Sequence, residues 1–125
     1  MTDYPDTLRY AAEHEWIAAE PPFRVGITRY AADALGDVVY IDPPAVGTTV
    51  TAGSAFGEIE STKSVSDLYA PATGVVTEIN EAAVADPSIV NDDPYGSGWL
   101  YVLEVSEPAP TLSAEEYQAL VDAKP

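Results

Sequence analysis

One lysine stands apart from the other candidates for chemistry in this sequence of 125 residues. The chain has only two lysines, Lys63 and Lys124, and Lys124 is next to the last residue. Any chemistry on an internal lysine therefore uses Lys63. Its neighbours, Ser61-Thr62-Lys63-Ser64, are typical of a turn between two strands. Such a turn leaves a lysine open to an attaching enzyme, since loops stay exposed while the flanking strands fix their direction.

A group joined covalently to this lysine becomes a tethered arm, whose effective concentration at successive partners is high. Acylation converts the ammonium into a neutral amide, so the arm rests on apolar surface without burying a charge. Residue type alone does not establish such a role. A lone lysine in a polar turn is most often a solvated surface residue.

The other residue types offer little catalytic chemistry. There is no cysteine, which removes thiol nucleophiles, disulfides and cysteine metal sites. His14 is the single histidine and has no clustered partner, so it makes a poor metal ligand. Beside Trp16, we expect it to pack or to form a hydrogen bond. With no nucleophile and base arrangement, phosphate loop or metal cluster in the sequence, we predict no catalytic residue and no enzyme activity.

Charge narrows the range of partners. The formal net charge is −16, from 21 acidic and 5 basic residues, and such a surface repels nucleic acid and anionic membranes. It steers a protein towards basic patches on other proteins. An acidic, salt-adapted proteome would produce the same composition, and charge alone does not separate these two explanations.

Chain length and the N-terminal residues limit the number of domains, the class of protein and its location. A chain of 125 residues with 46% hydrophobic residues fits one domain with one core. That size favours a carrier, a binding module or a subunit over a free-standing enzyme. No signal or transit peptide is recognisable, and no apolar run reaches membrane-spanning length. We therefore expect a cytoplasmic protein.

Strand-like segments dominate the sequence. Short runs of β-branched and aromatic residues are separated at close intervals by proline, glycine and asparagine, which is typical of strands joined by turns. Many short strands of this kind predict a mainly β fold, a small sandwich or barrel with helices as accessories. The expected strands cover residues 15–20, 23–28, 38–41, 48–51, 55–60, 65–70, 75–80 and 99–105.

Two helices are expected beside these strands. The first covers residues 29–35, between Thr28 as N-cap and Gly36 as left-handed C-cap. The second covers residues 113–123 and begins with a capping box, a serine followed three residues later by a glutamate. Two further expectations are one helical turn at 81–85, capped by Asn80, and a polar loop over 86–98.

The residues around Lys63 read Glu60-Ser61-Thr62-Lys63-Ser64-Val65-Ser66-Asp67, followed by Tyr69-Ala70-Pro71. This stretch resembles the lipoylation motif of the glycine cleavage H-protein family. In that motif the modified lysine follows Glu-Ser-x and precedes small residues, a Ser-Asp pair and then a proline. Thr62 stands where valine is more usual, and Ser64-Val65 replaces two small residues; both changes leave the lysine and its acids in place.

Further matches to this family extend over nearly the whole chain, from about Leu8 to Val121. Each is weak alone, and together they are highly specific. They are Tyr10 with His14-Glu15-Trp16, Val25-Gly26-Ile27-Thr28, Leu35-Gly36-Asp37 with Val38-Val39, Ala55-Phe56-Gly57, Asn91, Pro94-Tyr95-Gly96 and Gly98-Trp99-Leu100.

The resemblance implies a fold and a cofactor. The fold would be the flattened β-barrel of lipoyl domains, a barrel-sandwich hybrid, in a single lipoyl-carrier domain over residues 1–125. Residues 1–9 would form an N-terminal extension, and residues 113–123 the C-terminal helix. Lipoate would be attached covalently to Lys63, and the chain itself would catalyse no step.

It also implies partners. A pyridoxal-phosphate glycine decarboxylase would load the lipoyl group with the aminomethyl unit of glycine. An aminomethyltransferase would pass the carbon to tetrahydrofolate, and a flavin (FAD) dihydrolipoyl dehydrogenase would reoxidise the dithiol. A lipoate-attaching enzyme would recognise the hairpin. A carrier that docks with several enzymes in turn is expected to be a monomer.

Several site residues follow from the same resemblance. The loaded arm is labile and cationic, so it needs shelter from water and a nearby carboxylate. Glu15 and Asp67 are the expected carboxylates, although most of the 21 acidic residues simply solvate the surface. The further lining residues that it implies are Glu13 and Leu35, and the residues implied in lipoylation recognition are Glu60, Gly47 and Gly74.

Other functions stay open at the level of sequence. A biotinyl domain shares the design but normally flanks its lysine with methionines. The lipoyl domain of a 2-oxo acid dehydrogenase usually has aspartate before the lysine and alanine after it. From a different class, an unmodified acidic β-sandwich adaptor would make Lys63 dispensable, whereas a carrier makes it essential.

Overall fold

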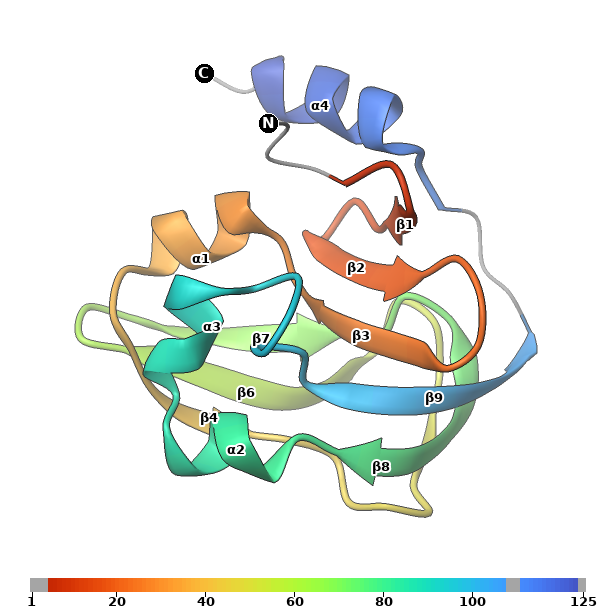
Figure 1. The fold of residues 1–125 in the computed structure, drawn as a ribbon, viewed down its shortest axis with the longest axis horizontal. Helices are drawn as coiled ribbons and strands as arrows, with labels where there is room; N and C mark the ends of the chain where they lie inside the picture. Colours follow the sequence, from red (N-terminus) through yellow and green to blue (C-terminus); the bar gives the residue numbers. More distant parts are fainter. Residues whose placement is uncertain (1–4, 108–110, 124–125) are drawn as a thin grey trace.

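Two antiparallel sheets form the body of the protein (Figure 1). The computed structural model describes residues 5–107 and 111–123. In these residues the larger sheet has the strand order β1-β2-β3-β9-β8-β5, and the smaller has the order β4-β6-β7. The strands are β1 (Leu8–Tyr10), β2 (Glu15–Ala18), β3 (Phe23–Ile27), β4 (Val38–Asp42), β5 (Thr49–Val50), β6 (Ala55–Ser61), β7 (Val65–Tyr69), β8 (Thr73–Ile79) and β9 (Tyr101–Glu107).

The main core lies between the two sheets. Alternating residues along each strand point inward, as in a sheet with one solvated face. Burying these apolar side chains is the main favourable contribution to folding, of about 1.5–3 kcal/mol for each large side chain. The mainly β two-sheet fold expected from the sequence is thus confirmed. Buried members of this core include Ile17, Val25, Ile27, Ile41, Ile59, Leu68, Val76, Tyr101 and Leu103.

Two helices form where the sequence places them. In α1 (Arg29–Leu35) the Thr28 side chain accepts a hydrogen bond from Ala31 N at 3.2 Å, and Gly36 ends the helix with φ of +82°. Helix α4 (Ala114–Asp122) begins with the predicted capping box between Ser113 and Glu116. This helix lies beside β1 (Figure 1), and its Tyr117 packs in a second, smaller core with Tyr10 and Trp16.

The segment predicted as a polar loop contains a helix. Helix α3 (Ser88–Asp92) begins after Pro87 and buries Val90 completely in the main core. Five residues are too few to show a helical period in sequence, and this one is stabilised by the tertiary contact of Val90. The expectation of an unstructured loop over residues 86–98 is therefore wrong for its first half.

The single helical turn predicted at 81–85 is present as α2 (Glu81–Ala85), but its expected cap is absent. Asn80 makes no side-chain capping bond; its Nδ2 donates instead to Ser97 O and Trp99 O, each at 2.7 Å. Through these two bonds, the Asn80 side chain links the start of α2 to residues 97–99 instead of capping the helix.

The N-terminal segment also differs from expectation. Part of the predicted extension is strand β1, which pairs with β2 through Leu8 and Ala18. Residues 1–4 of that extension lie outside the described part of the chain. Within residues 5–107 and 111–123, no helix has the length and apolar character needed to cross a membrane.

Candidate functional site

Lys63 occupies the tip of the hairpin between β6 and β7. The last pair of the ladder is Glu60 with Val65. Beyond it, Ser61 N donates to Ser64 O at 2.8 Å, while Ser61 Oγ accepts from Ser64 N at 3.1 Å and from Lys63 N at 3.3 Å. One serine side chain therefore satisfies two backbone donors of the turn. The turn predicted from the sequence is confirmed.

The lysine side chain lies across the end of α1. A Cβ added to Gly36 would be 3.2 Å from Lys63 Cε, so the side chain passes directly over this glycine. Thr62 N also donates to Asp37 O at 3.0 Å, which fixes the hairpin to the segment after α1. The sequence indicated Gly36 as the helix C-cap and as part of a family match, and neither signal pointed to its contact with Lys63.

Lys63 is exposed and its ammonium is unpaired within the described chain. The one salt bridge found in residues 5–107 and 111–123 joins Arg29 to Asp33 at 3.8 Å. An attaching enzyme therefore meets an accessible amine without having to break an ion pair. Lys124 lies outside the described residues.

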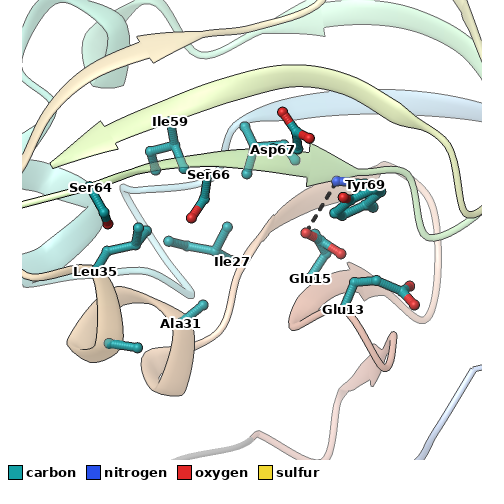
Figure 2. A pocket seen from close by; sticks show the side chains of 12 residues that line it. Glu13, Glu15, Ile27, Ala31, Leu35, Ile59, Ser64, Ser66, Asp67 and Tyr69 are labelled. Carbon is teal, nitrogen blue, oxygen red and sulfur yellow. Dashed lines mark hydrogen bonds between the residues drawn. The ribbon is translucent and has the colours of Figure 1, made fainter.

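A pocket of about 380 Å³ opens beside the hairpin (Figure 2). Its lining comes from both sheets and from α1, and it begins at Ser64, the residue after the lysine. The four residues that the resemblance implied as contacts of the arm all line this pocket: Glu13, Glu15, Leu35 and Asp67. The remaining lining residues are Ile27, Ala31, Ala34, Ile59, Ser66, Leu68 and Tyr69.

Glu15 is the buried acid of this pocket, with 3% of its surface exposed. Its Oε2 accepts a hydrogen bond from Tyr69 N at 3.3 Å (Figure 2), and within the described chain its Oε1 has no partner. Burial raises the pKa of this carboxyl from 4.5 to about 8, the Tyr69 N–H opposes the rise, and the charge of Glu13 adds to it. Near neutral pH, an empty pocket therefore holds Glu15 mainly as the neutral acid.

The other two acids lie at the mouth. Glu13 and Asp67 are both exposed, and Figure 2 shows the Asp67 carboxylate pointing away from that of Glu15. Asp67 is opposite Glu58 in the β6–β7 ladder, on the outer face of the smaller sheet. Of the carboxylates expected to hold the arm, Glu15 alone is buried inside the pocket.

The residues expected to support lipoylation do not form one group. Glu60 is in β6, three residues before the lysine. Gly47 and Gly74 lie at the β5–β8 edge of the larger sheet, away from the hairpin (Figure 1). Gly74 is in a strand rather than in a turn, and an added Cβ would meet Glu104 O at 2.2 Å. Its role in the fold is thus to allow β8 and β9 to pack closely.

His14 has the hydrogen-bonding role expected of it. Its Nδ1 is 2.6 Å from the hydroxyl of Tyr117, and its backbone adopts a φ of +75° between Glu13 and Glu15. No group of three or more potential metal-ligating side chains occurs in the described part of the chain. Sequence reasoning missed Tyr69, whose backbone holds Glu15, because a main-chain donor leaves no signature in residue type.

A lysine at the tip of a hairpin, in a small two-sheet domain with a sheltered pocket beside it, defines the class of covalent carrier proteins. The family model described as "Glycine cleavage H-protein" matches residues 8–124. The chain belongs to this family.

Individual relatives agree. A glycine cleavage system H protein of Thermobifida fusca is 53% identical over 122 residues, covering 96% of this chain and 97% of the relative. One of Streptomyces coelicolor is 54% identical over 122 residues, covering 95% and 98%. The crystal structure of a glycine cleavage system H protein from Mycobacterium marinum has a TM-score of 0.91 and 48% identity, covering 94% of this chain and 98% of that one.

Family membership confirms the main expectations from sequence. The fold is the barrel-sandwich fold of lipoyl domains. The chain is the lipoyl carrier of the glycine cleavage system and not an enzyme, and members of this family carry lipoate covalently on a lysine. It works with the enzymes of that system.

Proposed function

We propose that Lys63 is the lysine that carries the lipoyl group. The observation that supports it most strongly is the position of Lys63, exposed at the tip of a rigid hairpin with no ion-pair partner in the described residues. Neutralising this ammonium by acylation disturbs no salt bridge of the described chain. The alternative acceptor, Lys124, is next to the C-terminal residue.

We further propose that the pocket beside the hairpin is the resting place of the loaded arm. The pocket begins at Ser64, so an arm that leaves Lys63 reaches it without crossing other structure. Ile27, Leu35 and Ile59 offer apolar walls for the hydrocarbon part of the arm. At the far end, a cationic aminomethyl group would convert Glu15 into a charged partner, because an ammonium next to a carboxyl favours its ionised form.

The acids at the mouth have a lesser part in this proposal. Glu13 and Asp67 are solvated, so their attraction for the ammonium is weak compared with that of a buried carboxylate. They would favour entry of a cationic arm over a neutral one. Glu60 is proposed as a handle for the lipoate-attaching enzyme, whereas Gly47 and Gly74 would act on lipoylation only through the shape of the β5–β8 edge.

The cycle that we propose has four partners. The arm would take the aminomethyl group from a pyridoxal-phosphate glycine decarboxylase and pass its carbon to tetrahydrofolate on an aminomethyltransferase. It would then be reoxidised by a FAD-dependent dihydrolipoyl dehydrogenase, and a lipoate-attaching enzyme would load it at the start. We propose a cytoplasmic monomer that consists of one carrier domain. Nucleic acid and membranes are not among its proposed partners, because its net charge of −16 would be repelled by both.

Peptide mass spectrometry tests the attachment site. The chain, Lys63→Arg and the control Lys124→Arg are each incubated with a lipoate ligase, lipoate and ATP. We expect one lipoyl increment on the Lys63 peptide in the parent and in the control, and none in Lys63→Arg, which retains the charge and the fold. An increment on another residue, or none in a parent chain tested beside an active H protein, would overturn the assignment.

A further inference from the structure

Two buried oxygens in the described part of the chain lack a hydrogen-bond partner: Oε1 of Glu15 and the hydroxyl oxygen of Tyr101. Their residues have 3% and 0% of their surface exposed. Nearly all buried polar groups in proteins are paired, and each exception needs a physical reason. An unpaired buried hydroxyl costs about 1–3 kcal/mol, so an apolar phenylalanine would be the better residue at position 101 if the hydroxyl had no use.

The register of the larger sheet brings the two residues to one inward face. Tyr101 of β9 is opposite Val25 of β3, and Val25 is opposite Ile17 of β2. Glu15 precedes Ile17 by two residues, so its side chain points to the same face. The backbones of β2 and β9 are about 10 Å apart at two strand spacings, a gap that two long side chains reach across together.

Packing on the opposite sheet gives the same location. The ring of Tyr101 contacts that of Phe56 edge to face, with centroids 4.8 Å apart. Phe56 is in β6 beside Ala55, which pairs with Tyr69, and Tyr69 N is the donor to Glu15. The phenol therefore lies in the main core between the two sheets, close enough to Glu15 to feel its charge. Burial first, and then the charge of Glu15, raise the pKa of Tyr101, so its hydroxyl is a permanent donor.

We propose that Tyr101 is a positioning residue for Glu15: its hydroxyl donates to the second carboxylate oxygen, directly or through one internal water, when a cationic arm ionises this acid. The inference rests on the proposed contact between Glu15 and the loaded arm. With a neutral arm, Glu15 keeps its proton. When an ammonium arrives, that proton leaves for solvent, and the carboxylate is held by Tyr69 N–H, by the ammonium and by Tyr101.

The acids and the apolar side chains around Glu15 do not supply this donor, and the hydroxyls of Ser64, Ser66 and Tyr69 are part of the pocket lining itself. Glu13, on the loop before β2, opposes ionisation through its own charge. Asp67, on β7, is acidic and exposed, and the part of α1 that lines the pocket contributes Ala31, Ala34 and Leu35. Tyr101 thus stabilises the ionised carboxylate of Glu15, which lets the pocket distinguish a loaded arm from an empty one.

The titration of Glu15 by carbon NMR reads this role directly. The lipoylated chain is labelled at the side-chain carboxyl carbon of glutamate, and the Glu15 signal is assigned by its loss in Glu15→Gln. Its arm is reduced and alkylated with 2-bromoethylamine, which gives a stable cationic arm, or with iodoacetamide, which gives a neutral one. The chain has no cysteine, so the thiols of the arm are the only thiols present.

We expect the cationic arm to lower the pKa of Glu15 by about 2 units relative to the neutral arm. In Tyr101→Phe, the pKa with the cationic arm should lie about 1 unit higher than in the parent, the effect of losing one hydrogen bond to a charged group. Tyr40→Phe, on the exposed face of the smaller sheet, is the control and should titrate like the parent. Circular dichroism and urea unfolding verify that each variant is folded.

The outcomes separate the two proposals. If the cationic and neutral arms give the same pKa in the parent, the contact between Glu15 and the arm is wrong. If the cationic arm lowers the pKa equally in the parent and in Tyr101→Phe, the contact stands and the role of Tyr101 is wrong. A merely structural tyrosine would alter the stability of Tyr101→Phe and leave the titration of Glu15 unchanged.

Discussion

Glu15 combines near-complete burial with a single hydrogen bond, and this combination controls its charge. Desolvation raises the pKa of its carboxyl to about 8, so the acid titrates within the range of ordinary buffers. A cation that enters the pocket would lower the cost of ionising it. Glu13 and Asp67, at the mouth, are exposed to solvent and lack this burial.

The stability of the unloaded chain should therefore depend on Glu15. The folded chain keeps a proton that the unfolded chain releases at its ordinary pKa of 4.5. The contribution of this group is fully present below about pH 4.5 and is lost as the pH rises through about 8, by at most about 5 kcal/mol. We expect urea unfolding of the parent to show this loss between about pH 5 and pH 9.

Glu15→Gln should remove most of that pH dependence, because glutamine does not titrate. Glu104→Gln, at an exposed position of β9, is the control and should keep the slope of the parent. An equal slope in the parent and in Glu15→Gln would contradict the raised pKa.

Among the elements, the β6–β7 hairpin depends on the segment that ends α1. Gly36 has φ of +82°, and a Cβ added to it would lie 3.2 Å from Cε of Lys63. Thr62 bonds to Asp37 beside it. The direction in which the lysine leaves the hairpin is therefore set by a helix end as well as by the turn.

Gly36→Ala should affect both stability and lipoylation. The backbone conformation disfavours a side chain by about 1–3 kcal/mol, and the new methyl group displaces the lysine. Gly53→Ala is a matched control, because Gly53 has φ of +80° with nothing within 4 Å of its added Cβ. We expect both variants to lose stability in urea unfolding, and only Gly36→Ala to be lipoylated several-fold more slowly. Equal lipoylation rates would show that the contact with Lys63 has no role.

Helix α3 supports the same segment from the other side. Asn91 Nδ2 donates to Gly36 O at 2.8 Å, and Asn91 Oδ1 accepts from Val38 N at 2.9 Å. One side chain therefore satisfies the backbone on both sides of Asp37, to which the hairpin is attached.

Asn91→Ala should destabilise the chain by about 2 kcal/mol, since it leaves two backbone groups unpaired. Thermal or urea unfolding measures the loss. Asp92→Ala, at the exposed neighbouring position, is expected to change stability by less than about 0.5 kcal/mol. A loss of similar size in both variants would mean that the helix as a whole, and not the Asn91 bonds, holds the segment.

For the whole molecule, much of the fold is predictable from sequence, and the reasons for the exceptions are physical. Alternation and turn residues predict the strands, and Thr28 and Ser113 predict two helix starts, because these signals are local. Helix α3 is stabilised by the burial of Val90 in the distant core, and no local pattern reports that.

The candidate site, like the fold, could be predicted from sequence only in part. Lys63 and the four predicted lining residues are found at one place, because a motif and a resemblance to a family identify side chains by type. The contributions of Gly36, Tyr69 N and Tyr101 depend on register and on backbone conformation, which residue type does not specify. The separation of Gly47 and Gly74 from the hairpin shows the reverse: residues prominent in sequence need not lie together.

The net charge of −16 acts at the scale of the whole protein. If the acidic surface steers the carrier to basic patches on its partner enzymes, association should slow by about tenfold between low salt and about 0.5 M salt. Stopped-flow association with the glycine decarboxylase measures this rate, and a neutral osmolyte at equal viscosity is the control. A rate independent of salt would favour the other explanation, general adaptation of an acidic proteome.

The pocket is lined by residues of both sheets, and this makes the arm an intramolecular ligand of its own carrier. A ligand that binds only the folded state adds its binding free energy to the stability of the fold. The loaded carrier would then be its most stable form, and each partner enzyme would have to compete with the pocket for the arm. Release of the arm from the pocket would be favoured once the ammonium is gone, since Glu15 would regain its proton and the ion pair with the arm would be lost.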